Sequence, residues 1–329
     1  MKKAFPLSFF ALLLIIACQQ KNVLQVNEVS TALTPLVAQI KPPQSPLNEF
    51  EKFVSHLDSA EVSSISEAAQ EYASLFKEKP VALADSGYVI FEKFYQRVDK
   101  TINKTHQSSS TDFNLVLASN APSAPQQTQK FKEYNQTLQE NGFEVASKEE
   151  GTYLKQNRAF IATHFYPFIS PTLKEYLEQV NKETREGFAE DGSLTIIEEE
   201  LVSRVIWWEG FVAKHPSFIY TEESKARKKY YLTVLLEGLV NTPVLSLERK
   251  NKIDTYFAVA YQELYKCAPQ SEANKLVQPY FKALLRPDKT QAYALLKQYR
   301  QAGVIIDSSE PKSEHMLSRN GSQGEPLTD

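Results

Sequence analysis

Hydrophobic residues recur at three- and four-residue steps from Leu47 onward, the spacing that places side chains on one face of an α-helix. Polar and charged residues fill the positions between them, up to about residue 302. The first three stripes are Leu47, Phe50, Val54 and Leu57; Val62, Ile65, Ala69, Tyr72 and Phe76; and Phe91, Phe94, Val98 and Ile102. The pattern predicts an all-α fold, an irregular multi-helix bundle of about ten helices over residues 47–302.

One long interruption divides this helical region. Residues 107–129 are rich in Ser, Pro, Gln and Asn and contain a single short apolar run, Phe113 to Ala118. A loop of this length is either disordered or functional, so we expect one helical domain or a domain divided at this segment. The helical period resumes at Phe131 and stops at Asn141-Gly142, a pair that favours the end of a helix.

Two short sequences further on predict helix starts. Ser147-Lys148-Glu149-Glu150 has the form of a capping box, in which the Ser hydroxyl and the Glu carboxylate each accept a backbone N–H. Ser170-Pro171 predicts the start of another helix, because Pro is favoured at the first helical position. We expect the helix that starts at Ser147 to have four residues on one of its sides, namely Leu154, Arg158, Ile161 and Phe165.

The most hydrophobic helix candidate runs from Thr195 to about Val212. Thr195 and Glu198 have the spacing of a second capping box. One full apolar stripe consists of Ile197, Leu201, Val205, Trp208 and Val212. Much of a neighbouring face is apolar as well, which predicts a central helix with neighbours on more than one side.

Adjacent tryptophans on this helix point about 100° apart and cannot share one contact surface. Trp208 continues the apolar stripe and is expected in the core. Trp207 lies with Arg204 and Phe211 on an adjoining face, and these three are the candidate partner-binding residues. We expect a second helix to cover that face; the alternative is a groove in which an aromatic ring and an Arg hold a partner.

Further helices are expected at 222–240, 253–264, 276–285 and 288–302, with Pro279 as a kink or a restart. Gly303 closes the last of them. The residues after Asp307 are polar and rich in Ser, Gly and Glu, and we expect residues 303–329 to form a disordered C-terminal tail.

The N-terminus has a different pattern. A short basic start, Met1-Lys2-Lys3, precedes a mostly apolar run from Ala4 to Ala17. This run is too short for a transmembrane helix, which needs about 20 residues, and it predicts a signal peptide over residues 1–17. The residues at its end, Ile15-Ile16-Ala17-Cys18, resemble the lipobox of bacterial lipoproteins.

The resemblance implies that residues 1–17 are removed, that Cys18 carries the lipid, and that the chain is anchored in a membrane of the bacterial cell envelope. More than one acyl chain makes such an attachment stable. The residue after the Cys is Gln19, and in this position the chain resembles lipoproteins that are sent to the outer membrane. The expected location in a Gram-negative cell is therefore the periplasmic side of that membrane. Residues 18–46, punctuated by prolines, are expected to form the lipidated tether.

The net charge and the number of cysteines limit the possible functions and the state of Cys267. The formal net charge of −3 falls to −5 once Lys2 and Lys3 leave with the signal peptide, which does not suit nucleic-acid binding. The one basic run, residues 225–229, predicts a solvated helix face or a contact with anionic lipid head groups. Cys267 has no partner in the chain if Cys18 is lipidated, and we expect it to be a buried, unreactive thiol.

The sequence predicts no cofactor and no metal site. Asp191 to Glu198 matches the second half of an EF-hand calcium loop, but the two earlier ligand positions are Gly187 and Ala189, which have no side-chain oxygen. The five histidines are scattered, and His164 among aromatic neighbours predicts a half-buried side chain. The chain has no nucleophile elbow, no phosphate-binding Gly loop and no dinucleotide fingerprint.

These observations predict a membrane-anchored helical lipoprotein that acts as a binding or scaffolding module. Its expected partners are the lipid bilayer, through acylated Cys18, and an envelope protein or glycan. The alternative is an envelope hydrolase acting on glycans or peptides, whose acids and histidines converge only in three dimensions. A third hypothesis is a helical bundle that holds an apolar small molecule.

Lipidation can be tested by feeding cells labelled palmitate. We expect label on the wild-type chain and none on the Cys18→Ser variant, because the acyl groups are attached through that residue. The Cys267→Ser variant is the control and should keep both its label and its stability, since no disulfide is lost. Equal labelling of the wild type and Cys18→Ser would contradict the lipobox assignment.

Overall fold

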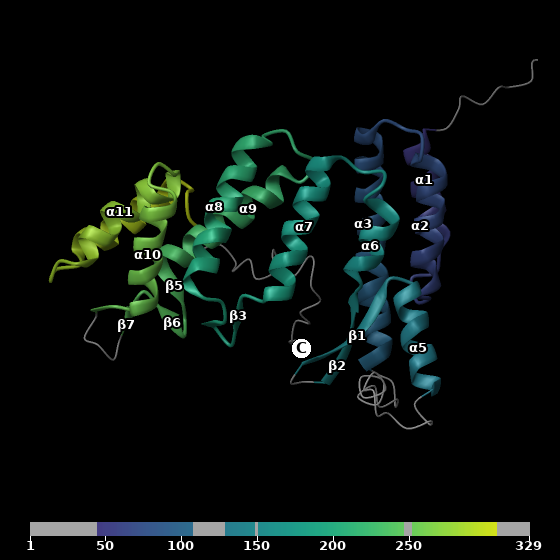
Figure 1. Cartoon of the computed structure of the whole chain (residues 1–329), viewed down its shortest axis with the longest axis horizontal. Coiled ribbons are helices and arrows are strands. Elements are labelled where there is room, and N and C mark those ends of the chain that lie inside the picture. Colours follow the sequence, from purple (N-terminus) through teal and green to yellow (C-terminus); the bar gives the residue numbers. More distant parts are fainter. Residues whose placement is uncertain (1–44, 108–128, 149–150, 247–251, 308–329) are drawn as a thin grey trace, which may run out of the picture. The chain divides into compact units, whose positions relative to one another are not determined.

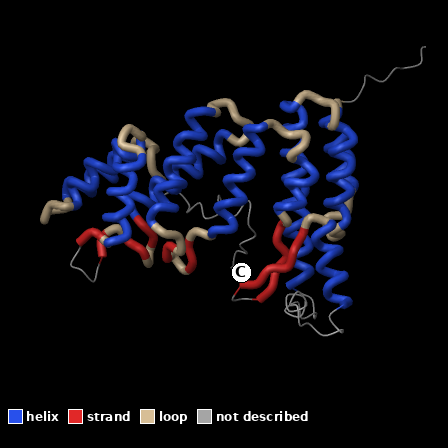
Figure 2. The backbone as a smooth tube through the Cα atoms, in the orientation of Figure 1, coloured by secondary structure: helices blue, strands red, loops and turns tan. Residues whose placement is uncertain are grey.

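The computed structural model describes residues 45–107, 129–148, 151–246 and 252–307. The predicted signal peptide, Cys18 and nearly all of the predicted tether lie outside the described residues. Within them the chain forms eleven helices and four two-stranded hairpins, which confirms the predicted all-α, multi-helix fold. Figure 2 shows that the strands are short segments between helices. Among the described helices, none has both the length and the apolar character of a membrane span.

The first three helices pack against one another (Figure 1). They are α1 (Pro46–His56), α2 (Ser63–Phe76) and α3 (Val81–Gln107). Aromatic rings at the predicted apolar positions fill the space between them. Phe50 of α1 meets Tyr72 and Phe76 of α2 edge to face, with ring centroids 5.8 and 5.7 Å apart. The periodicity therefore located both the helices and their buried faces.

The helix start predicted at Ser147 is wrong, and only the later part of the predicted helix forms, as α6 (Arg158–Phe165), with Ile161 and Phe165 buried as expected. After α5 (Gln129–Glu140) the chain forms an antiparallel hairpin of β1 (Phe143–Lys148) and β2 (Gly151–Gln156). Phe143 and Val145 alternate toward the core, as strand residues do. Across the hairpin Glu144 pairs with Lys155 at 2.9 Å.

Asn103 of α3 fixes this hairpin to the helices. Its side-chain Oδ1 accepts the Leu154 N–H and its Nδ2 donates to the Leu154 carbonyl, both at 2.8 Å. The amide thereby occupies both backbone groups of one β2 residue, much as a neighbouring strand would. Leu154 is buried on a strand, where the sequence predicted a helix.

Helix α6 (Arg158–Phe165) leads into α7 (Pro171–Glu186). The predicted start at Ser170-Pro171 is confirmed, because the Ser170 hydroxyl accepts the Leu173 N–H at 3.1 Å. Phe165 joins α6 to the first helices, with its ring 4.7 Å from Tyr72 and 4.1 Å from Phe91 between centroids.

The segment that partly matches an EF-hand loop, Asp191 to Glu198, begins with the tight turn of a β-hairpin. Asp191 and Gly192 have φ of 46° and 73° and join β3 (Ala189–Glu190) to β4 (Ser193–Leu194). Asp-Gly is a favoured pair for such two-residue hairpin turns. Helix α8 (Glu198–Lys214) then begins without a side-chain cap. The capping box predicted at Thr195 is therefore wrong, since Thr195 bonds through its backbone to the Phe188 carbonyl in the turn region.

Helix α9 (Thr221–Glu237) packs along α8 and ends three residues before the predicted Val240. Gly238 has φ +75° and turns the chain into β5 (Gly238–Leu239), which pairs with β6 (Thr242–Pro243). A further short hairpin follows, formed by β7 (Leu245–Ser246) and β8 (Lys252–Ile253). Backbone turns, rather than loss of hydrophobic periodicity, thus set the end of α9.

The last helices are α10 (Thr255–Cys267), α11 (Glu272–Leu284) and α12 (Thr290–Gln301). Pro279 lies inside α11. The Glu209 carboxylate of α8 accepts the Glu272 and Ala273 N–H groups at 2.8 and 2.9 Å, which fixes the start of α11 to α8. Ile305 is fully buried, so residues 303–307 belong to the folded body and the rest of the predicted tail lies outside the described residues.

A matched pair of glycines tests the fold. Gly238→Ala should lower the free energy of unfolding by at least about 1–2 kcal/mol, because φ is positive and the new Cβ would lie 2.3 Å from the Thr242 carbonyl oxygen. Gly210→Ala should raise it by about 0.5–1 kcal/mol, because a Cβ on this α8 residue meets nothing within 4 Å. Urea titration measures both, and a loss of stability in Gly210→Ala would contradict the placement of α8.

Candidate functional site

Trp208 of α8 contacts two residues of α7, Tyr176 and Glu183. Its side chain is 0% exposed, which confirms the expectation that it belongs to the core. The indole Nε1–H donates to Glu183 Oε1 at 2.7 Å. A buried Trp usually needs such a partner for its N–H, and here the partner comes from α7.

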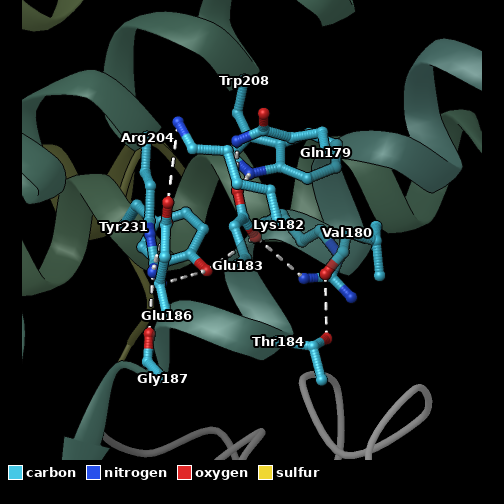
Figure 3. A network of polar contacts seen from close by, with 11 residues as sticks. Gln179, Val180, Lys182, Glu183, Thr184, Glu186, Gly187, Arg204, Trp208 and Tyr231 are labelled. Atoms are coloured by element: carbon cyan, nitrogen blue, oxygen red, sulfur yellow. Dashed lines mark hydrogen bonds and ion pairs between the residues drawn. The ribbon is translucent and has the colours of Figure 1, made fainter. Parts of the chain in front are cut away.

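Glu183 is a buried carboxylate that receives four donors. Figure 3 shows three of them around it, Gln179, Trp208 and Tyr231. Glu183 is only 5% exposed. Oε1 accepts Trp208 at 2.7 Å and Gln179 at 2.8 Å, and Oε2 accepts Tyr231 at 2.9 Å and Arg227 at 3.3 Å. Because both oxygens are fully hydrogen-bonded and Arg227 supplies the opposite charge, the carboxylate is stable without solvent.

Arg227 extends this network toward the N-terminal helices. Its guanidinium lies over the Trp208 ring, 5.4 Å from the centroid. Burial opposes its charge, but the neighbouring Tyr176, Glu183 and Tyr231 more than offset this and raise the pKa of Arg227. Tyr176 in turn stacks on Tyr220, with centroids 5.2 Å apart and planes 13° apart.

The Tyr220 hydroxyl donates to Glu92 of α3. Burial raises the pKa of the Glu92 carboxyl, and the hydrogen bond from Tyr220 partly counters that rise. A continuous series of polar and aromatic contacts therefore links α3 to α7, α8 and α9.

The structure places Arg204 away from the other two candidate residues. Its side chain is only 2% exposed. The guanidinium donates to the Gly187 carbonyl at 2.7 Å and pairs with Glu186 at 3.2 Å, which fixes the end of α7 to α8. Arg204 also lies over the Phe188 and Tyr231 rings at 5.6 and 5.7 Å. The Arg204 side chain therefore stabilises the packing of α7 on α8 and is too deeply buried to contact a partner.

Trp207 and Phe211 do come together. Their rings stack with centroids 4.9 Å apart and planes 12° apart. Phe211 is buried, whereas Trp207 is half-buried and lines a cleft. Two of the three residues on this face, Arg204 and Phe211, are therefore covered as expected, while Trp207 is covered only in part. A partner-binding role for Trp207 remains a hypothesis, and Arg204 takes no part in the cleft.

The cleft, which we call the Trp207 cleft, has a volume of about 650 Å³. It lies along α7, between α6 and Trp207 of α8. Its charged residues include three cations and two carboxylates. The lining residues are Arg158, Ala159, Ala162, Tyr166, Glu175, Glu178, Gln179, Asn181, Lys182, Arg185 and Trp207. Gln179 connects this surface to the buried network, because it also donates to Glu183.

Asn181 is a buried polar residue in the wall of the Trp207 cleft. The residue is 6% exposed, and its Nδ2 donates to the Tyr166 hydroxyl at 3.4 Å. Its Oδ1 has no hydrogen-bond partner among the described residues. That oxygen is itself buried, so it is not open to the cleft, and an acceptor without a partner costs free energy there.

A smaller cleft of about 300 Å³ lies on the other side of Trp207, where α8 meets α10. Cys267 lines it and is exposed, so the prediction of a buried thiol is wrong. It is the last residue of α10, where the helix face turns to solvent. The thiol donates to Glu263 Oε1 at 2.7 Å, and this hydrogen bond raises the pKa of Cys267. The unreactive thiol form is therefore favoured.

The expected environment of His164 is confirmed. Its ring is half-buried and lies 4.3 Å from the Phe160 ring, and burial lowers its pKa. Across the described ranges, no group of three or more His, Cys, Asp or Glu side chains could hold a metal ion.

Sequence reasoning missed Glu183 and Arg227. The signal was present in the spacing, since Glu183 follows Leu173, Tyr176 and Val180 at helical steps on the buried face of α7. Arg227 likewise falls between Ser224 and Tyr231 on the buried face of α9. A charge at a core position indicates a buried partner, but the two stripes do not say that these two charges pair with each other.

Comparisons with protein-family models, with curated proteins and with solved structures gave no match. Function is therefore inferred from the residues of this chain.

The two tryptophans should differ sharply in their effect on stability. Trp208→Ala should lower the free energy of unfolding by about 3–5 kcal/mol, and it also removes one donor from Glu183. Trp207→Ala should cost clearly less, because one side of its ring already faces a cleft. Thermal and urea unfolding measure both variants. Equal losses would mean that Trp207 is a core residue.

Proposed function

We propose that this chain is a lipid-anchored binding protein of the bacterial cell envelope, and that it binds an envelope polymer in the Trp207 cleft. The observation that carries the proposal is the position of Trp207. The Trp207 ring stacks on the Phe211 ring and contacts the Trp208 ring edge to face, and it also lines an open cleft.

A fixed aromatic ring is well suited to binding. Trp207 stacks on Phe211, and its neighbour Trp208 is held by Glu183, so little rotamer freedom remains to be lost when a ligand arrives. Preorganisation of this kind raises affinity by lowering the entropic cost of association. Trp is also enriched among the residues that dominate binding energy.

The cationic and anionic side chains that line the cleft favour a polar ligand that carries both positive and negative groups. Arg158, Lys182 and Arg185 can hold carboxylates, while Glu175 and Glu178 can hold amines. A cell-wall glycan with peptide branches has all of these groups, and the C–H face of a sugar ring can pack on the Trp207 ring.

Binding is favoured over hydrolysis by the state of the carboxylates. Glycoside hydrolysis needs an acid and a base free to act on the bond. Glu183 is buried and receives four donors. At the cleft, Glu175 pairs with Lys214 at 3.2 Å and Glu178 lies 3.9 Å from Lys174. Both are exposed ion pairs of low strength, so an amine of the ligand can replace the lysine, and these carboxylates suit recognition of a cation.

Anchoring supports the same role. The lipobox at residues 15–18 predicts a lipid at Cys18, and α1 begins only at Pro46. Residues 19–45 could span about 90 Å if fully extended. A body tethered in this way can bind a polymer at a distance from the membrane.

The proposal can be tested by sedimentation with purified cell-wall sacculi. We expect the wild-type chain to pellet with sacculi and Trp207→Ala to remain in the supernatant, because the variant lacks the aromatic wall of the cleft. Tyr293→Ala is the control, since this 57% exposed ring of α12 does not line the cleft. Both variants should show wild-type helical circular dichroism before the assay.

Three outcomes would contradict parts of the proposal. If the wild type does not pellet, a glycan with peptide branches is not the ligand. If both variants pellet equally well, the Trp207 cleft is not the binding site. Soluble fragments released from the sacculi by the wild type would favour the hydrolase alternative.

A further inference from the structure

The basic run at residues 225–229 is divided by the geometry of α9. Arg227 points inward and pairs with Glu183 at 3.3 Å. Lys225, Lys228 and Lys229 line a separate cleft on the other side of the helix. This arrangement follows from helical spacing, because residues one or two positions from Arg227 point away from it.

This cleft, which we call the lysine cleft, has a volume of about 450 Å³. It lies between α9, the start of α11, and residues 303–304. Lys275 of α11 adds a fourth ammonium group, although it is about 50 positions from the basic run in the sequence. The volume is within the range of about 300–1,000 Å³ that is typical of small-molecule sites.

The lysine cleft has an apolar floor. Leu232 of α9 and Ala273 of α11 are buried beneath it, and Leu276 and Val304 are half-buried at its sides. A surface of this kind, charged at the rim and apolar within, matches a molecule with a charged head and a hydrocarbon portion.

The charge of the lysine cleft is positive. The charged residues that line it are four lysines and one carboxylate, Glu272, so the net charge of the lining is +3. Glu272 pairs with Lys275 at 2.7 Å, and Glu222 outside the cleft pairs with Lys225 at 2.8 Å. Both paired lysines remain more than half exposed, so their N–H groups are accessible to a second anion.

We propose that the lysine cleft binds a single anionic phospholipid. The phosphate lies among the lysine ammonium groups, and the glycerol and first chain carbons lie on Leu276 and Val304. The charge favours an anion, and the apolar floor favours a lipid over free phosphate. Lysine binds phosphate as a point charge, so no planar arginine fork is needed.

This site is independent of the Trp207 cleft and of lipidation at Cys18. It shares no lining residue with the Trp207 cleft. A tethered body that also holds a membrane lipid here would be oriented with α9 and the start of α11 toward the bilayer.

The test uses the full chain carrying Cys18→Ser, so that no acyl group on that residue enters the cleft. Calorimetric titration is carried out with short-chain phosphatidylglycerol below its micelle concentration, with short-chain phosphatidylcholine, and with inorganic phosphate. We expect saturable, one-to-one binding of phosphatidylglycerol and much weaker binding of the other two. The double variant Lys228→Gln/Lys275→Gln should bind about 25-fold more weakly, because each lysine near an anionic lipid contributes roughly fivefold.

The control is Lys93→Gln/Lys132→Gln, which removes two exposed charges from α3 and α5, outside the cleft. Its affinity should stay within about twofold of the parent, because distant exposed charges are screened. The proposal is overturned if phosphatidylglycerol does not bind, if phosphatidylcholine binds equally well, or if the control loses as much affinity as the cleft variant. Phosphate binding as tight as that of the lipid would show a phosphate site instead and would also overturn it.

Discussion

The buried ion pair between Glu183 and Arg227 is the interaction on which the helical body depends most. One carboxylate of α7 takes hydrogen bonds from α7, α8 and α9, and its counter-ion is as deeply buried as it is. Removing one member of such a pair costs about 3–5 kcal/mol, because the other charge stays behind in a poorly polarisable interior. Hydrogen bonds that need these donors at fixed distances admit few alternative packings of the three helices, so the pair constrains geometry as well as stability.

Both clefts follow from this constraint. Trp208 must point inward to donate to Glu183, so Trp207, about 100° further round α8, must point toward α6 and α10. In the same way, the inward direction of Arg227 turns Lys225, Lys228 and Lys229 outward. The same buried network therefore places an aromatic ring at one surface and a cluster of ammonium groups at another. A binding function for these surfaces requires rigid support, and the network supplies it.

The network also connects the two sides of the segment 107–129. Tyr176 and Tyr220 carry the contacts from Arg227 to Glu92 of α3, while Asn103 of α3 holds the hairpin that follows the segment. The hydrophobic core is likewise one cluster that extends from Phe50 to Ile305. A ligand held in the Trp207 cleft would contact α6, α7 and α8 together, at the place where these contacts meet.

Local sequence determined much of this protein. Helical periodicity located the helices and placed Trp208 in the core, and Ser170-Pro171 marked the start of α7. The lipobox at residues 15–18 remains a prediction from local sequence. Tertiary structure decided the rest. The β1–β2 hairpin replaced a predicted helix because cross-strand pairs and the distant Asn103 stabilise it. Glu183 and Arg227, 44 positions apart, could be paired only by the packing of α7 against α9. The wide apolar face of α8 correctly predicted neighbours on more than one side, but a helical stripe does not say which element covers each residue, so the exposure of Trp207 and Cys267 depends on where other helices end. Local periodicity shows which face of a helix is apolar; only the arrangement of all the helices decides which faces stay open to a ligand.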